Sequence, residues 1–148
     1  MSTQPSKPTC VVFDMDGIVV NSIREHYNRE FSEGNFDSFE RDLPTFPAFE
    51  NTILLLKTLA TQHKITFITA RSEAYRDATR EWIDTHMGLE DYTLLMRPEG
   101  DTRKDYQLKF DILKFSLQKR YNIIAAFDDN KRVVKMYREQ GITTWINV

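Results

Sequence analysis

Two aspartates stand one residue apart directly after a short apolar run, in the stretch Val11-Val12-Phe13-Asp14-Met15-Asp16-Gly17. The apolar run is typical of a buried strand, and a strand alternates its side chains, so Asp14 and Asp16 leave its end on the same face. Two carboxylates this close repel each other unless a cation or a shared proton relieves them. Because Mg²⁺ is a hard cation that takes oxygen ligands, we expect a magnesium site here. The alternative is a loop in which both aspartates are solvated or cap a turn.

A hydroxyl and a lysine in two later segments suit the same chemistry. The second apolar segment, 64–71, ends in Thr69 and a cation, and Lys109 lies within a stretch with helical spacing. Such groups around a carboxylate pair can bind a phosphoryl group and neutralise the charge that develops on it. Each has an ordinary alternative. Thr69 can be a plain strand-end hydroxyl, and Lys109 can be a solvated helix lysine, with Lys104 and Lys114 as competitors for its role.

A second carboxylate pair follows the third apolar run, which begins at residue 122. The pair is Asp128 and Asp129, with Asn130 next in the chain. These residues could simply cap the helix that follows, because Asp and Asn are common helix caps. A cap needs one carboxylate, however, so a pair directly after a buried strand favours a metal site shared with the first pair.

Strands and helices alternate through the second half of the chain. Predicted strands begin at residues 10, 64, 92, 122 and 143, and predicted helices cover 49–62, 72–86, 104–120 and 131–140. This order predicts a three-layer, Rossmann-like α/β fold with a central parallel sheet. Ligands of such sheets bind beyond the carboxyl ends of the strands, where both carboxylate pairs and Thr69 lie. In the first of these helices, Leu54, Leu55 and Leu59 widen the apolar face, so we expect that helix to be well buried.

Two segments fall outside this alternating pattern. Residues 1–9 are polar and contain two prolines, so we expect a disordered lead-in. The irregular segment 18–47 carries four phenylalanines, two prolines and mixed charges, with a short helix predicted over 22–31. A segment this long and irregular in a compact domain is usually functional or mobile.

Composition limits the class of protein. The chain has 148 residues, 41% of them hydrophobic, which predicts one globular domain. Its net charge of -2 argues against a broad basic surface, so any contact with a polynucleotide must be local. No apolar run approaches the ~20 residues of a membrane span. The single cysteine, Cys10, cannot form an internal disulfide, and we expect a cytoplasmic protein.

Taken together, Asp-x-Asp, then Thr, then Lys, then Asp-Asp resemble the four motifs of the haloacid dehalogenase (HAD) superfamily. The resemblance implies a Mg²⁺-dependent phosphomonoesterase that works through an aspartyl-phosphate. Asp14 would be the nucleophile and Asp16 the general acid and base, while Thr69 would bind the phosphoryl oxygens and Lys109 would neutralise charge and hold Asp14. The implied Mg²⁺ ligands are Asp14, the Asp16 backbone carbonyl, Asp128 and Asp129. Ile18 stands where the superfamily usually has a small hydroxyl residue.

The stretch 100–109, together with segments 133–138 and 141–145, is similar to the phosphatase domain of bacteriophage polynucleotide kinase-phosphatases. That family removes 3′-phosphates from polynucleotide ends during end repair, and its kinase half is absent from this sequence. In the HAD superfamily the segment after the first strand can form a cap over the site, so the resemblance implies a small cap or flap over 18–47. The similarity to the bacteriophage enzymes is poor in this flap. The resemblance implies roles for five further side chains: Arg71 would contact the substrate phosphate, Asp105 would orient Lys109 or Arg71, Arg103 and Lys104 would line the entrance, and Arg24 would contact phosphate from the flap. Arg103 and Lys104 could equally form a solvated turn.

Three functions remain open on the sequence. The first is a polynucleotide 3′-phosphatase acting on RNA or DNA ends, with a kinase or ligase as a separate partner. The second is a 5′(3′)-nucleotidase acting on nucleoside monophosphates, because the acidic net charge and the unmatched flap leave the substrate undecided. The third is a non-catalytic HAD-like binding module. The intact set of carboxylates and lysine argues against that third reading, since such a cluster of like charges is costly to keep.

Overall fold

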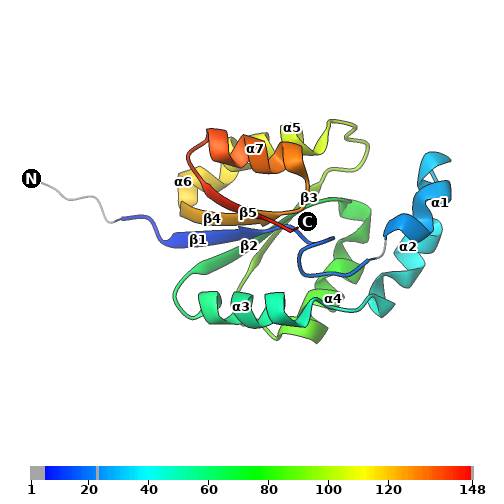
Figure 1. Ribbon diagram of the computed structural model, residues 1–148, viewed down its shortest axis with the longest axis horizontal. Helices are drawn as coiled ribbons and strands as arrows, with labels where there is room; N and C mark the ends of the chain where they lie inside the picture. The colour runs from blue at the N-terminus through cyan, green and yellow to red at the C-terminus, as the bar shows by residue number, and fades with distance from the viewer. Residues whose placement is uncertain (1–5, 23, 148) are drawn as a thin grey trace, which may run out of the picture.

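A five-stranded parallel sheet forms the centre of the molecule, in the strand order β3-β2-β1-β4-β5 (Figure 1). The computed structural model describes residues 6–22 and 24–147. The strands are β1 (Thr9–Phe13), β2 (Lys64–Ser72), β3 (Thr93–Arg97), β4 (Asn122–Asp128) and β5 (Thr143–Ile146). All four pairings between neighbours are parallel, which confirms the predicted α/β fold. The chain order reverses beside β1, so β1 lies at the switch point where ligands of such sheets bind.

Helices cover both faces of this sheet (Figure 1). One face carries α3 (Glu50–Ala60) and, after the short turn η3 (Glu73–Tyr75), α4 (Arg76–Met87). The other carries α5 (Asp105–Ile112), the π-helical turn η4 (Leu113–Leu117), α6 (Gln118–Arg120) and α7 (Lys131–Glu139). The helix predicted over 104–120 is therefore present as a continuous helical segment, in which the π-helical turn η4 separates α5 from α6. No helix among residues 6–22 and 24–147 is long and apolar enough to cross a membrane.

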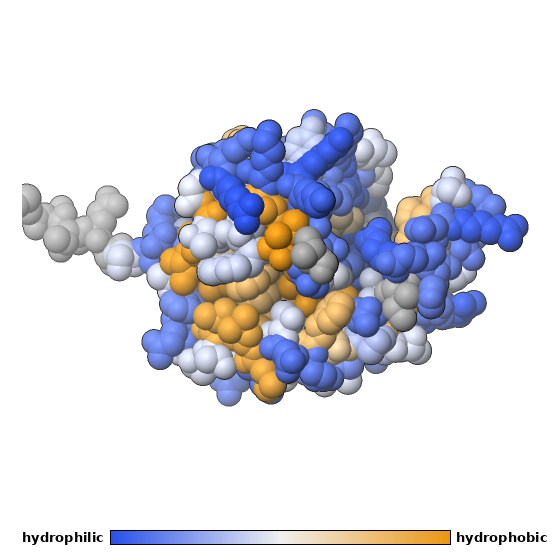
Figure 2. All heavy atoms as spheres, viewed as in Figure 1, coloured by the Kyte–Doolittle hydropathy of each residue, from blue (hydrophilic) through white to orange (hydrophobic). Residues whose placement is uncertain are grey.

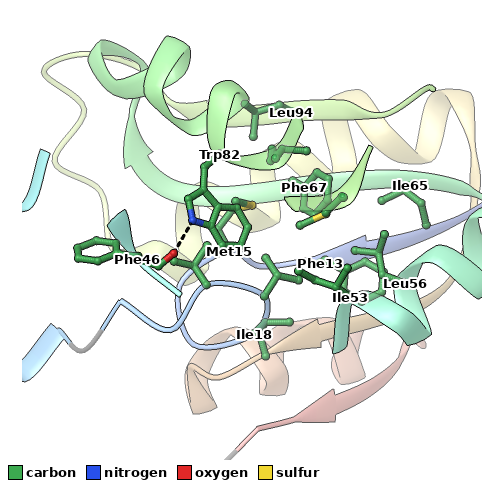
Figure 3. Packing of buried hydrophobic residues seen from close by; sticks show 14 of the residues in the cluster. Phe13, Met15, Ile18, Phe46, Ile53, Leu56, Ile65, Phe67, Trp82 and Leu94 are labelled. Carbon is green, nitrogen blue, oxygen red and sulfur yellow. Dashed lines mark hydrogen bonds between the residues drawn. The ribbon is translucent and has the colours of Figure 1, made fainter. Parts of the chain in front are cut away.

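Two hydrophobic clusters hold the helices on the sheet. The side chains of β1 point alternately into one cluster and into the other. Phe13 points into the larger cluster, where Phe67 and Trp82 also lie (Figure 3). Val12 points into the other cluster with Leu113 and its neighbours. Successive side chains of a strand face opposite sides of the sheet, so β1 is buried on both faces. This burial fixes the position of the two aspartates that follow.

The helix α3 is less buried than its sequence indicates. Leu54 is 63% exposed and Leu55 is 46% exposed, whereas Ile53 and Leu56 are buried. The prediction that the extra leucines widen the buried face was wrong for these two. Leu54 and Leu55 face solvent because α3 packs on the sheet through a narrow apolar face that includes Ile53 and Leu56. Figure 2 shows apolar atoms gathered over α3 and β5 on this face of the molecule.

The segment after β1 forms a small helical flap that projects beyond the carboxyl ends of the strands (Figure 1). It contains η1 (Arg24–Tyr27), α1 (Asn28–Ser32), α2 (Asp37–Asp42) and η2 (Leu43–Thr45). Phe31, Phe39 and Phe46 pack around Tyr27 with ring centroids 5.3 to 5.9 Å from its own. Trp82 of α4 donates a 2.9 Å hydrogen bond to the Phe46 carbonyl, which ties the flap's end to the body (Figure 3).

At the amino end, the ordered structure starts earlier than expected. Thr9 already belongs to β1, and the Pro8 carbonyl accepts a hydrogen bond from the Asn122 N–H. Lys7 Nζ donates to the Gln118 carbonyl at 2.7 Å. The rest of the predicted lead-in, residues 1–5, lies outside the described residues.

Candidate active site

Lys109 joins the two carboxylate pairs at the carboxyl end of the sheet. Its Nζ donates to Asp14 Oδ1 at 3.1 Å and to Asp128 Oδ2 at 2.7 Å. Asp14 follows β1, Asp128 ends β4, and Lys109 reaches both from the second turn of α5. All three side chains are buried. The structure thus brings Lys109 to the site, while its sequence competitors Lys104 and Lys114 are exposed.

Burial and mutual charge determine how these groups ionise. Burial raises the pKa of Asp14 well above its usual range, and although Lys109 opposes the rise, the neighbouring carboxylates Asp128, Asp129 and Asp16 add to it. Burial alone would lower the pKa of Lys109, but Asp14 and Asp128 outweigh it, so that pKa is raised. Lys109 therefore stays positively charged at any physiological pH. The carboxyl of Asp14 therefore needs positive charge in addition to that of Lys109 before its ionised form is favoured.

Asp16 and Arg71 form a second buried ion pair beside the first. Arg71 Nε and Nη2 donate to the two Asp16 carboxylate oxygens at 2.7 and 2.6 Å, and Nη1 donates to Thr79 Oγ1 at 3.1 Å. Burial would raise the pKa of Asp16, but the Arg71 guanidinium outweighs it and lowers that pKa. Arg71, predicted to contact substrate phosphate, is thus fully engaged by the protein in this state.

Thr69 lies at the end of β2, fully buried between these groups. Its Oγ1 accepts a hydrogen bond from the Arg71 N–H at 3.2 Å. The pairing of β2 with β3 is irregular between Ile68 and Ser72, so the backbone here leaves the regular ladder. Ser72 Oγ then accepts a hydrogen bond from the Ala74 N–H and caps the turn η3 that precedes α4. The strand end therefore presents Thr69 and Arg71 to one point.

Three carboxylates meet in a group that suits a metal ion. One oxygen each of Asp14, Asp128 and Asp129 lies within 4.8 Å of the others. Asn130 caps α7 by accepting from the N–H groups of Arg132 and Val133. Because Asn130 supplies the cap, the two aspartates before it are not needed for capping. An all-oxygen donor set of this kind fits Mg²⁺. The Asp16 side chain is not in the group, and the role of its backbone carbonyl as a ligand stays a prediction.

Gly17 determines how close Asp129 can come to this group. Its φ is +87°, and a Cβ built there would lie 2.1 Å from Asp129 Oδ2. The sequence alone indicates Gly17 only as a residue that lets the chain turn. The structure shows a second requirement, because any side chain would displace the Asp129 carboxylate. Asn147 Nδ2 donates to the Gly17 carbonyl at 2.7 Å and holds the turn from the other end of the chain.

The remaining predicted residues divide into two groups. Arg24 of the flap and Asp105 of α5 line the same pocket as the carboxylates, a hollow of about 300 Å³. Arg103 and Lys104 are exposed, and neither lines that pocket. Arg103 donates to Asp101 and Asp111, and its role at the entrance stays a prediction.

Asp105 does not hold Lys109 or Arg71 in the structure, contrary to the expected role. Its Oδ1 accepts from Arg97 Nη2 at 2.8 Å. Arg97 also donates to the carbonyls of Ala70, Asp101 and Arg103, so it fixes the turn before α5 to the end of β2. Sequence reasoning missed Arg97. The available signal was an arginine at the end of an apolar strand, directly before Pro98.

Comparison with known proteins places this site in a family. Residues 8–147 match the family model of the polynucleotide kinase PNKP phosphatase domain. The chain belongs to this family. It is therefore a HAD-type phosphatase domain, a phosphoric monoester hydrolase, and the predicted resemblance is confirmed.

Individual relatives agree with the family match. The chain is 35% identical over 143 residues to a protein of Autographa californica nuclear polyhedrosis virus described as a bifunctional polynucleotide kinase/RNA ligase, covering 95% of this chain and 19% of that protein. A chain of the Pnkp1/Rnl/Hen1 RNA repair complex superposes with a TM-score of 0.77 at 24% identity, covering 99% of this chain and 44% of that one. A HAD-like hydrolase of Streptococcus pneumoniae shares the fold, with a TM-score of 0.65, 16% identity, and coverage of 94% and 84%. This phosphatase domain spans about a fifth of the viral relative and less than half of the repair-complex chain.

Proposed function

We propose that this phosphatase domain is a Mg²⁺-dependent polynucleotide 3′-phosphatase that prepares nucleic-acid ends for repair. The observation that carries the proposal is the buried arrangement of Lys109 between Asp14 and Asp128, with the Asp16–Arg71 pair beside it. This arrangement fits phosphoryl transfer, and the family match points to polynucleotide ends as the substrate. Like the kinase/ligase relative, it would work together with kinase and ligase activities.

In the proposed reaction, Asp14 attacks phosphorus and forms an aspartyl-phosphate, while the ester oxygen leaves with a proton from Asp16. Asp16 then removes a proton from the water that hydrolyses the intermediate. Lys109 holds the attacking carboxylate and stays charged throughout, so it balances negative charge on the phosphoryl oxygens. Thr69 would donate its hydroxyl to one of these oxygens. Mg²⁺, when held by Asp14, Asp128 and Asp129, would supply the positive charge that keeps Asp14 ionised.

A general acid must carry a proton, but the Arg71 guanidinium lowers the pKa of Asp16 and so favours its ionised form. A phosphate dianion entering the pocket competes for the same guanidinium. When Arg71 turns toward phosphate, Asp16 loses its partner and its pKa rises, so it can take up the proton that it must donate. Arg71 would thus act on phosphate and on Asp16 in turn, which reconciles its expected role with its observed contacts.

The test is phosphate release from a matched panel, with Mg²⁺ and with EDTA. The panel holds a 3′-phosphorylated oligonucleotide, the same oligonucleotide 5′-phosphorylated, and 3′- and 5′-nucleoside monophosphates. We expect Mg²⁺-dependent release, fastest from the 3′-phosphorylated oligonucleotide, and none with Asp14→Asn. A preference for the free nucleotides would replace the proposal with a nucleotidase. Undiminished turnover by Asp14→Asn would refute the assignment of the nucleophile.

A further inference from the structure

A hollow larger than the carboxylate pocket lies outside it. It is a groove of about 870 Å³ between α5 and α7, which pack side by side on one face of the sheet (Figure 1). None of the predicted catalytic or metal-binding residues lines it. Residues of both helices line it, Tyr106 and Phe110 from α5 and Arg132, Lys135 and Met136 from α7, together with Arg103.

The two helices that form the walls of the groove both begin at the carboxylate pocket. Asp105 and Asn130 line the pocket, and each stands at the start of one of the two helices. Tyr106 and Arg132, which come one and two residues later, line the groove. A chain whose 3′-phosphate sat beside Asp14 would therefore meet the groove as its next surface.

The lining combines flat apolar surfaces with cations. Tyr106 and Phe110 are half-buried aromatic side chains on α5, and the buried Met136 lies opposite on α7. Arg132 is exposed at the near end, and no ion-pair partner is found for it among the described residues. Lys135 has only an exposed pair with Glu139 at 3.2 Å, which a competing phosphate can replace at little cost.

Aromatic surfaces that stack bases, beside cations that follow a phosphate backbone, are the combination that binds single-stranded nucleic acid. We propose that the α5–α7 groove binds the single strand that precedes the 3′-phosphate. The proposal rests on the proposed function, since it takes the strand's phosphorylated end to lie in the carboxylate pocket. It also explains how a domain with a net charge of -2 can hold a polyanion locally.

The geometry limits how much of the strand the groove can hold. From Arg132 to Gln140, α7 rises about 12 Å, which at ~3.4 Å per stacked nucleotide corresponds to about three or four nucleotides. The acidic side chains Asp111 and Glu139 also line the groove and would repel a backbone that continued past the cations. The gain from a longer substrate should therefore stop after a few nucleotides.

The decisive measurement is kcat/KM for 3′-phosphorylated substrates of increasing length, from the 3′-mononucleotide to an octanucleotide, with Mg²⁺. For the wild-type domain we expect kcat/KM to rise about tenfold or more up to about four nucleotides, mostly through KM, and then to stay level. In Tyr106→Ala and Arg132→Ala, the ratio between tetranucleotide and mononucleotide should fall several-fold. The matched controls are Phe115→Ala, an aromatic residue 67% exposed outside the groove, and Lys57→Ala on α3. Both controls should keep the wild-type ratio.

A ratio near one in the wild-type domain would overturn the groove as a strand-binding site, and so would equal losses in the control variants. A preference for a 3′-phosphate on a blunt duplex over the same single strand would overturn it as well. If no substrate released phosphate, the proposed function would fail, but fluorescence anisotropy of a labelled 3′-phosphorylated tetranucleotide would still test the groove. Binding that Tyr106→Ala weakens and Phe115→Ala preserves would support it.

Discussion

The contact between Gly17 and Asp129 makes a sharp prediction about metal binding. In Gly17→Ala, the new Cβ would stand 2.1 Å from Asp129 Oδ2, where ordinary contact begins at 3.4 Å. The Asp129 carboxylate can yield because it is the far end of a flexible side chain. It must move by about 1 Å, whereas metal–ligand distances tolerate only about ±0.2 Å. We therefore expect Mg²⁺ affinity to fall about tenfold or more, roughly 1.4 kcal/mol of binding free energy.

Backbone strain must be separated from this displacement. Gly17 has φ +87°, so alanine there costs about 1–2 kcal/mol of stability by itself. Gly100 has a φ of +79°, and nothing lies within 4 Å of the position of its Cβ, so Gly100→Ala carries the strain without the contact. The assay is phosphate release against Mg²⁺ concentration, with thermal unfolding in EDTA for both variants. An unchanged Mg²⁺ requirement in Gly17→Ala, or an equal rise in Gly100→Ala, would refute the reasoning.

Three other substitutions test the buried charges and the flap. Lys109→Met leaves Asp14 and Asp128 buried without their cation, so we expect activity to be lost and the unfolding free energy in EDTA at pH 7 to fall by about 3–5 kcal/mol. Little change in chemical denaturation would contradict this. Asp14→Asn should act in the opposite direction. Because the pKa of Asp14 is raised in the folded state, ionisation of this carboxyl at pH 7 opposes folding. The variant should therefore unfold at a higher temperature than the wild type in EDTA, by about 2–4 °C for each ~1 kcal/mol of stability gained. That advantage should shrink as the pH falls and wild-type Asp14 takes up its proton, and a difference in melting temperature that stays constant with pH would count against it. Trp82→Phe removes the hydrogen bond to the Phe46 carbonyl and should cost about 1 kcal/mol in thermal unfolding, with Tyr92→Phe, whose hydroxyl bonds Asp84 at the surface, as the milder control.

The sheet and much of the site follow from the sequence because both depend on local patterns. A buried strand must be apolar, and the residue after it must lie at the sheet's edge, so the positions of Asp14, Thr69 and Asp128 follow from the sequence alone. Lys109 does not follow in the same way, because Lys104 and Lys114 compete for its role in the sequence, and only the structure shows which lysine reaches Asp14 and Asp128.

Contacts between side chains that are distant in the chain do not follow from such patterns. The partners of Arg71 and Asp105 depend on rotamers chosen in three dimensions, and nothing local distinguishes Asp16 or Arg97 as those partners. The exposure of Leu54 depends on how α3 lies on the sheet, not on its own pattern. The helix α2 is not predicted because the flap's aromatic residues pack on one another without helical spacing.

The balance of charge around Lys109 has a thermodynamic consequence. Five carboxylates and three cations line the pocket, so the ionised site is short of two positive charges: Asp14, Asp16, Asp105, Asp128 and Asp129 against Arg24, Arg71 and Lys109. That deficit equals the charge of one Mg²⁺. Without the metal, a phosphate dianion would enter an already negative pocket; with it, the same dianion enters a neutral one. By linkage, phosphate must then strengthen Mg²⁺ binding by the same factor by which Mg²⁺ strengthens phosphate binding. On the proposed function, metal and substrate would therefore act as mutual effectors, and each would bind more weakly alone than in the presence of the other.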